Sequence, residues 1–394
     1  MDFYKKLNVP MSQPNISDLE IELVNAVLKS DSLSMGPYLR EFEERIAEVA
    51  NCKHAIAVNS GTAGLHCCVR AAGWGVGHYV ITSPFSFVAS VNALLYEGVT
   101  PILVDVDPLT GNIDPALASQ AAEDLACQGE ASRKWLPEKN SDPMGTLKGI
   151  LAVDVFGQPA DYDALNETAR KANLKVIEDS CEAIGAAYKG RPAGSLADFG
   201  VFAFYPNKQM TTGEGGVVVT NDADSAMMIR ALRNQGRAPS DTWLDHTYLG
   251  FNYRMDEMSA ALGVAQLRRL PSLLEARSQV ADWYEEELKD IPGIELPKKA
   301  ATTTYTSWFV YVIRLDRSIN RNEVIRKLDA LGIPSRPYFS PIHLQPYMVE
   351  KFGYRAGDFP IAEDLGARGL AIPFSSKLNR NQVYQVASAL RQVL

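Results

Sequence analysis

The chain has 394 residues, of which 46% are hydrophobic and 22% charged, and its formal net charge at pH 7 is -8. These values are typical of a soluble globular protein that is long enough for two domains. An acidic chain without a basic patch argues against nucleic acid as a partner. No apolar run approaches the length that spans a membrane, so a membrane protein is not expected either.

The cysteines and the N-terminus indicate the compartment. The five cysteines are odd in number and lack the spacing of metal ligands, a pattern that favours reduced thiols. The N-terminus leads into a polar stretch rather than an apolar signal core, which argues against secretion. We therefore expect a cytoplasmic chain without a metal site.

Two helices are expected before the first strand. Ser17 is followed three residues later by Glu20, which together form a capping box at a helix start. A second helix follows Gly36, because Pro37 suits the first helical turn. Its apolar residues recur at helical spacing, at Leu39, Phe42 and Ile46.

Short apolar runs then alternate with helical patterns. The strand candidates are Ala55–Val58, Tyr79–Thr82, Thr100–Val104, Gly149–Val153, Leu174–Ile177, Gly200–Phe204 and Gly216–Thr220. These runs lack strict apolar and polar alternation, as expected where helices cover both faces of a sheet. The pattern predicts an α/β domain over residues 1–265, with a mainly parallel central sheet flanked by helices. Residues 126–148 are polar and are interpreted as an inserted surface loop.

The pattern changes after residue 265. Leu267–Tyr284 is predicted to be a long amphipathic helix, and Trp308–Leu315 alternates like a half-buried antiparallel strand. Asn320 caps another helix that ends at Gly332, a strand-like segment follows near Ser335–Phe339, and a last helix starts at Asn379. This order predicts a smaller α+β domain over residues 266–394.

One lysine lies between two of the predicted buried strands. Lys208 follows Pro206 on a loop, and small residues lead from it to the next strand at Val217. Asp179 stands at the carboxyl end of another strand. Most lysines are solvated surface groups and most strand-end aspartates cap helices or turns. Together, however, an amine and a carboxylate are the groups that hold pyridoxal phosphate (PLP), through a Schiff base and the pyridinium nitrogen.

A phosphate site is expected where the first strand enters a helix. Ser60, Gly61 and Thr62 occupy this junction, where unpaired N–H groups, two hydroxyls and a glycine can approach a phosphate. Ordinary N-capping is the alternative for this segment. Phe87 follows the next strand and could stack on a flat ring, although packing in the core is the commoner role of a phenylalanine.

Several motifs in order give the chain a strong resemblance to the DegT-type PLP-dependent aminotransferases of nucleotide-sugar biosynthesis. The likeness covers nearly the whole length and rests on segments 59–63, 178–183, 204–209, 212–216 and 250–255. It implies a fold-type-I aminotransferase, usually a homodimer with active sites at the subunit interface.

The resemblance also implies roles for individual residues. Lys208 would be joined to the cofactor, and Asp179 would meet its pyridine nitrogen. Phe87 would stack on the ring, and the Ser60–Thr62 segment would hold the phosphate. Asn252 matches an asparagine that reaches the phosphate from the neighbouring subunit.

Two positions depart from the commonest pattern of this family. Glu182 stands where many relatives have Gln or His near the ring oxygen of the cofactor. An ionised Glu182 would repel a phenolate, so we expect it to be protonated or turned to another partner. Ala203 replaces a serine that contacts the phosphate, which removes one hydroxyl donor.

The resemblance implies transfer of an amino group from L-glutamate to a nucleotide-linked keto sugar, for a surface polysaccharide or a secondary metabolite. Arg336, Tyr338 and His343 lie in a Pro-rich loop of the second domain and are candidates for binding the sugar, although such loops usually only connect elements.

Three alternatives stay open at this point. A PLP-dependent sugar dehydratase of the same fold would replace Lys208 by histidine. A PLP-binding sensor without turnover would need no catalysis, and this chain lacks a DNA-binding segment. A nicotinamide-dependent oxidoreductase would carry a dinucleotide fingerprint, which this α/β pattern does not contain.

Overall fold

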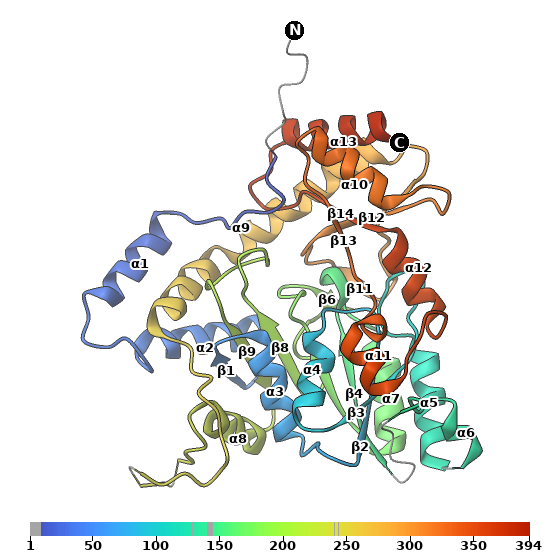
Figure 1. Ribbon diagram of the computed structural model, residues 1–394. Helices are drawn as coiled ribbons and strands as arrows, with labels where there is room; N and C mark the ends of the chain where they lie inside the picture. The colour runs from blue at the N-terminus through green and yellow to red at the C-terminus, as the bar shows by residue number, and fades with distance from the viewer. Residues whose placement is uncertain (1–8, 128, 140–144, 240, 243) are drawn as a thin grey trace.

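A computed structural model describes residues 9–127, 129–139, 145–239, 241–242 and 244–394 (Figure 1). A seven-stranded sheet forms the centre of the larger part, and a four-stranded sheet forms the centre of the smaller part above it in Figure 1. Among these residues no helix combines the length and the apolar character that crossing a membrane requires.

The seven-stranded sheet is mainly parallel, as predicted. Its strands lie in the order β1 (His54–Val58), β9 (Gly216–Thr220), β8 (Phe199–Ala203), β5 (Lys175–Asp179), β4 (Thr146–Val153), β2 (His78–Thr82) and β3 (Thr100–Leu103). Only β9 runs against its neighbours, because it pairs antiparallel with both β1 and β8. The remaining pairs are parallel. The carboxyl ends of β1, β5 and β8 therefore meet at one edge of the sheet.

Helices cover both faces of this sheet. Helices α3 (Gly61–Ala71), α4 (Ala89–Tyr96) and α8 (Ala223–Arg233) pack on one face, where Leu151 and Val153 of β4 point. Helices α5 (Pro115–Cys127) and α7 (Tyr162–Ala172) pack on the other face, against Ile150 and Ala152. Successive strand residues are thus all buried, which explains why the strands show no strict alternation.

The interpretation of residues 126–148 as one surface loop is wrong at both ends. Helix α5 continues to Cys127 because its apolar stripe extends through Leu125, and Glu130–Arg133 form the short helix α6. Strand β4 begins at Thr146, before the predicted start at Gly149, because its first residues already pair with β2. Residues 128 and 140–144 lie outside the described part of the chain.

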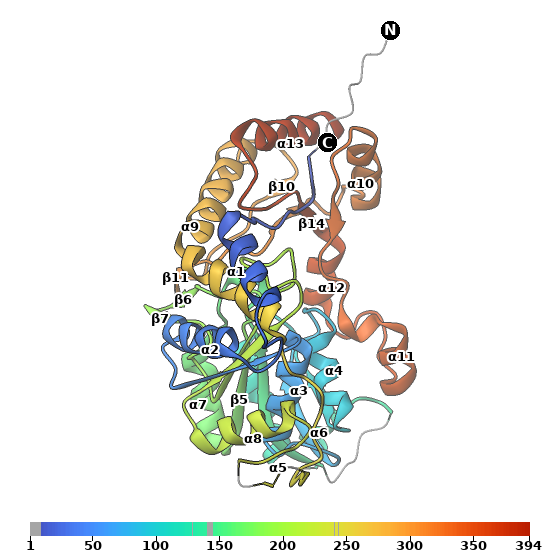
Figure 2. The ribbon, with the colours of Figure 1, turned by 90° about the vertical axis from the view of Figure 1, so that its left-hand side faces the viewer.

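Helix α9 (Glu257–Leu288) connects the two parts and appears as the long diagonal helix in Figures 1 and 2. It starts ten residues before the predicted Leu267, because the side chain of Asp256 caps it by accepting from the Ser259 N–H at 2.9 Å. Its first half packs on the larger part through residues such as Leu270 and Leu273. Its second half packs in the core of the smaller part through Val280, Tyr284 and Leu288. The predicted boundary at 265/266 falls inside α9, so the division into two domains stays a prediction.

The N-terminal helices begin as predicted. Helix α1 (Asp18–Leu28) starts with the capping box of Ser17 and Glu20 and lies along α9 (Figures 1 and 2). Helix α2 (Pro37–Ala50) starts at Pro37 and buries its predicted apolar residues, Leu39, Phe42 and Ile46.

The smaller part has the expected α+β arrangement. Its sheet has the order β10 (Ile294–Glu295), β12 (Tyr311–Leu315), β14 (Gly369–Ile372) and β13 (Arg336–Pro337), with all pairs antiparallel. Its helices are α10 (Arg321–Ala330), α11 (Pro346–Phe352), α12 (Pro360–Arg368) and α13 (Arg380–Val393), with the one-turn helix η2 (Ile342–Leu344). Asn320 and Asn379 cap α10 and α13 as predicted. The two strands near 308 and 335 are shorter than predicted.

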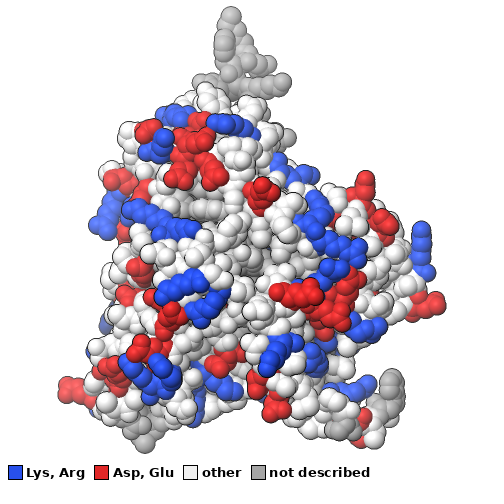
Figure 3. Space-filling model, turned by 180° about the vertical axis from the view of Figure 1, so that it is seen from behind, with Lys and Arg blue, Asp and Glu red and all other residues white. Residues whose placement is uncertain are grey.

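Two small features complete the fold. A three-stranded sheet joins β11 (Thr303–Tyr305) to β6 (Ala187–Tyr188) and β7 (Arg191–Pro192), so the two parts share it. The one-turn helix η1 (Val155–Gly157) follows β4. On the face seen in Figure 3, basic and acidic side chains are interspersed, with no single sign covering it.

Candidate active site

A cavity of about 430 Å³ lies at the edge where the carboxyl ends of the strands meet. We call it the lysine cavity. It brings together seven of the residues predicted from the sequence to bind the cofactor: Ser60, Gly61, Thr62, Phe87, Asp179, Glu182 and Lys208. They come from the start of α3, the start of α4, the end of β5 and the loop after β8. Segments that are far apart in the sequence thus form one site.

Lys208 is held on a tight turn and its amine faces this cavity. Its backbone N–H donates to the carbonyl of Tyr205 at 2.9 Å. The Nζ atom lies 3.5 Å from Oε1 of Glu182 and 3.8 Å from the centre of the Phe309 ring. The side chain is 13% exposed. A mostly buried amine with one long contact to a carboxylate is placed to react rather than to be solvated.

Asp179 ends β5 and is 4% exposed. The Ser90 hydroxyl donates to Oδ2 of Asp179 at 2.6 Å, and the Cys181 N–H donates to Oδ1 at 3.2 Å. These two bonds fix the orientation of the carboxylate. Sequence reasoning missed Ser90, which lies in the first turn of α4, with its hydroxyl 2.9 Å from that of Ser86 in the preceding loop.

The neighbouring Glu178 has a different role. It is fully buried and points to the opposite face of the sheet from Asp179, where its oxygens accept from Ser180 Oγ at 2.8 Å, from the N–H of Gly194 at 2.5 Å and from that of Leu196 at 2.8 Å. With three donors it fixes the loop after β7, and it does not line the lysine cavity. Of the two adjacent carboxylates, Asp179 is therefore the one available to a cofactor.

The start of α3 forms a cradle that fits a phosphate. Ser60 caps the helix, since its Oγ accepts from the Ala63 N–H at 3.1 Å. A Cβ atom on Gly61 would lie 2.7 Å from Cβ of Ala203 and 2.9 Å from Sγ of Cys181, so only glycine fits there. A helix N-terminus with a bare backbone and adjacent hydroxyls attracts a phosphate. The cradle, the lysine amine and the strand-end carboxylate together fit the three polar ends of PLP.

Glu182 has two partners in the cavity. The Phe156 N–H donates to its Oε2 at 2.9 Å, and its Oε1 lies near the Lys208 amine. Burial raises the pKa of Glu182, while the charge of Lys208 and the bond from Phe156 act in the opposite direction. The carboxyl group is thus turned to partners that offset part of the effect of its burial, in agreement with one of the two expectations from the sequence.

The other predicted site residues lie in different surroundings. Tyr338 lines the lysine cavity. Asn252 is exposed outside it, and its carbonyl accepts from Nδ2 of Asn59 at 3.3 Å. Arg336 is exposed and donates to the Ser335 carbonyl at 2.9 Å.

His343 is fully buried and does not reach the cavity. Its Nε2 lies 3.0 Å from Oε1 of Glu363, and its ring packs edge-on against Phe359. Burial lowers the pKa of His343, against the opposing effect of Glu363. This histidine joins η2 to α12 inside the smaller part, so we do not carry it forward as a sugar-binding residue.

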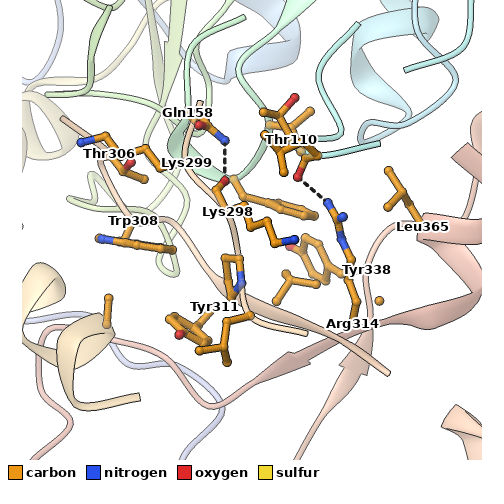
Figure 4. A pocket seen from close by; sticks show the side chains of 18 of the residues that line it. Thr110, Gln158, Lys298, Lys299, Thr306, Trp308, Tyr311, Arg314, Tyr338 and Leu365 are labelled. Atoms are coloured by element: carbon orange, nitrogen blue, oxygen red, sulfur yellow. Dashed lines mark hydrogen bonds between the residues drawn. The ribbon is translucent and has the colours of Figure 1, made fainter. Parts of the chain in front are cut away.

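A second cavity of about 290 Å³, which we call the seam cavity, lies between the two parts of the molecule (Figure 4). Tyr338 lines both cavities. Arg314 of β12 donates to the carbonyls of Pro108 and Leu109, at 2.6 and 2.8 Å, across the seam. Lys298 pairs with Glu295 at 3.3 Å. The cations here are already partnered, and Arg314 joins the smaller part to a loop of the larger one.

Known proteins share this sequence and this fold. The GDP-perosamine synthase of Caulobacter vibrioides is 40% identical over 364 residues, which cover 92% of this chain and 91% of that protein. The structure of DesI with its TDP-sugar product matches with a TM-score of 0.84 and 32% identity, and covers 99% of this chain and 93% of DesI. Spr1654 of Streptococcus pneumoniae, solved in a PLP form, matches with a TM-score of 0.87 and 26% identity, over 98% of both chains.

The match to a family profile covers nearly the whole chain. Residues 14–391 match the profile of the DegT/DnrJ/EryC1/StrS aminotransferases. The fold-type-I architecture and the cavity with its lysine, aspartate and phosphate cradle agree with that match. The resemblance found in the sequence is confirmed: the chain belongs to the DegT/DnrJ/EryC1/StrS aminotransferase family and is a PLP-dependent sugar aminotransferase.

Proposed function

We propose that this aminotransferase moves the amino group of L-glutamate to a keto sugar linked to a nucleotide, with Lys208 and Asp179 as its catalytic residues. The observation that carries this proposal is that both residues line one cavity together with a phosphate cradle. The names of its relatives support the substrate class, since one is a GDP-perosamine synthase and another was solved with a TDP-sugar product.

Each group of residues in the cavity would have its own chemical role. PLP, when bound, supplies an electron sink for charge that develops at the carbon of the donor. The Ser60–Thr62 segment would bind the phosphate, and Phe87 would stack on the ring. Asp179 would keep a proton on the pyridine nitrogen, with Ser90 fixing the orientation of the carboxylate. The Lys208 amine would move a proton between the carbon that gives up the amino group and the carbon that receives it.

We further propose that the active enzyme is a homodimer whose partner completes the site. Lys208 is the only cation among the described residues that line the cavity, whereas glutamate and a nucleotide-linked sugar both bring negatively charged groups. Among the residues that line it, Phe87 is 63% exposed and Tyr205 53%, so two large aromatic side chains are open to a partner surface. A second copy that brings Asn252 and basic residues over the mouth would satisfy both needs.

We also propose a cytoplasmic location and a role in amino-sugar synthesis for a polysaccharide or a secondary metabolite. Among the described residues all five cysteines are free thiols, as is usual in a reducing compartment.

The experiment is a panel of nucleotide-linked 3-keto and 4-keto sugars offered with L-glutamate, with products identified by mass. We expect one nucleotide-linked sugar to gain an amino group and glutamate to become 2-oxoglutarate. Conversion of a free keto sugar in preference to every nucleotide-linked one would overturn the acceptor class. Conversion with another amino acid but not with glutamate would overturn the donor.

A further inference from the structure

Arg277 lies at the point of α9 where its packing changes from one part of the molecule to the other. Leu273, one turn earlier, belongs to the core of the larger part. Val280, one turn later, belongs to the core of the smaller part. Arg277 itself is 2% exposed. A guanidinium in this position is surrounded by both parts and by little water.

The two terminal nitrogens of Arg277 bind different parts of the molecule. Nη2 donates to the carbonyl of Lys208 at 2.5 Å and to that of Asn207 at 3.3 Å. Nη1 donates to the carbonyls of Trp308 and Phe309 at 3.2 and 3.1 Å. One nitrogen therefore holds the lysine loop, and the other holds the residues that lead into β12.

The two residues whose carbonyls are held by Nη1 also line the two cavities. The Phe309 ring lies 3.8 Å from the Lys208 amine. The Trp308 side chain lines the seam cavity, where Figure 4 shows it beside Lys299 and Tyr311. The backbone carbonyls of the reactive lysine and of Phe309, whose ring lies against its amine, thus share one donor group.

We propose that Arg277 is a positioning residue of this aminotransferase, which sets the Lys208 loop against Phe309 by holding both backbones with one guanidinium. The proposal rests on the proposed role of Lys208. A planar fork with two terminal nitrogens can hold one side with each nitrogen, whereas a lysine amine has all its donors on a single nitrogen.

The burial of this charge is costly, which argues that the contact has a use beyond packing. No carboxylate pairs with Arg277 among the described residues, and all four of its acceptors are neutral carbonyls. Burial lowers the pKa of Arg277 to about 10. A buried cation without an acidic partner contributes less to the stability of the fold than an apolar residue of the same shape would.

The test compares Arg277→Met and Arg277→Lys with Arg321→Met as the matched control. Arg321 also donates to two backbone carbonyls, those of Gly366 and Gly369, and burial lowers its pKa too, but its own side chain lines neither the lysine cavity nor the seam cavity. Four properties are measured: the unfolding temperature, kcat, the acetylation rate of Lys208 in the cofactor-free protein by peptide mass, and the pH midpoint of the bound cofactor's absorption.

We expect Arg277→Met to change the acetylation rate of Lys208 at least about threefold and to shift the pH midpoint away from the wild-type value. It should also lower kcat about 100-fold, as a displacement of about 1 Å in a reacting group can do. Arg277→Lys should fall between wild type and Arg277→Met in all three properties. Arg321→Met should lower the unfolding temperature and leave the acetylation rate and the pH midpoint as in wild type.

The inference is overturned if Arg277→Met, or Arg277→Lys where the first variant does not fold, keeps the wild-type acetylation rate and pH midpoint. A loss of stability alone, like that of the control, overturns it as well. Failure of the proposed function looks different, because then borohydride would not attach the cofactor to Lys208 even in the wild-type protein.

Discussion

The lysine cavity and the seam cavity lie side by side and share Tyr338, yet their polar groups are arranged in opposite ways. In the seam cavity the cations already have partners, as Arg314 has in the carbonyls of residues 108 and 109. In the lysine cavity the Lys208 amine has one polar contact, with Glu182 at 3.5 Å, and Oδ1 of Asn207, a residue that lines the cavity, is buried without a partner in the described residues.

This contrast indicates which cavity is built for a ligand. Buried polar groups in folded proteins are nearly always paired. The polar groups of the lysine cavity that lack close partners are therefore suited to bind a cofactor and a substrate. The paired groups of the seam cavity hold the two parts of the molecule together. Cavity volume alone would not have separated them, since both fall near the size of small-molecule sites.

Removing one lysine from each cavity should give the largest contrast between them. Lys208→Ala should lower the rate of transamination about 10⁴-fold or more, as removal of a nucleophile does in other enzymes. Lys298→Ala should stay within about threefold of the wild-type rate, because its partner Glu295 is outside the lysine cavity. Steady-state kinetics with glutamate measure both. Similar losses in the two variants would contradict the different roles of the two cavities.

The carboxylates offer the next largest effect. Asp179→Asn should lower kcat about 10³-fold, because a neutral amide cannot hold the proton of the pyridine nitrogen. Glu295→Gln, in the seam, is the control and should leave kcat nearly unchanged while it lowers the unfolding temperature. If Asp179→Asn kept a rate close to that of wild type, Asp179 would not be needed to hold the proton on the pyridine nitrogen.

A methyl group in the phosphate cradle should have a smaller effect. Gly61→Ala forces its Cβ to within 2.7 Å of Ala203, an overlap that costs about 1–3 kcal/mol. We expect cofactor affinity to fall about tenfold to 100-fold, since about 1.4 kcal/mol corresponds to tenfold. Gly75→Ala meets only the Glu97 carbonyl at 3.8 Å and serves as the control. Equilibrium dialysis of the cofactor measures both variants, and equal affinities would show that the cradle does not bind it.

The smallest expected effect is on the pH dependence of the free energy of unfolding. Because burial raises the pKa of Glu182 above its usual 4.5, the folded cofactor-free protein keeps this proton to higher pH than the unfolded chain does. The free energy of unfolding therefore falls as pH rises from 4.5 through the raised value. Glu182→Gln should remove this component, which urea unfolding at a series of pH values measures. An identical pH profile in the variant would mean that Glu182 has no raised pKa.

Much of the site could be predicted from the sequence because it is built at the ends of local elements. Asp179 ends a strand, Ser60 caps a helix, and Lys208 stands on a turn between strands, and each of these positions follows from the apolar pattern around it. The mainly parallel sheet was predictable for the same reason. These features depend on short stretches of chain.

What could not be predicted depends on how distant elements approach. Phe309 and Arg277 reach Lys208 only because α9 and β12 pack beside its loop. His343 looked available in a Pro-rich loop, but α12 supplies Glu363 and buries it. Neither outcome has a signature in the neighbouring residues, since burial there is decided by tertiary contacts.

The assignment of Lys208 is tested by reducing the wild-type protein with borohydride in the presence of PLP and mapping the modified peptide by mass. We predict that the cofactor becomes attached to Lys208 and that Lys208→Ala abolishes the attachment. Attachment to another lysine, such as Lys298 in the seam cavity, or no attachment at all, would contradict this assignment.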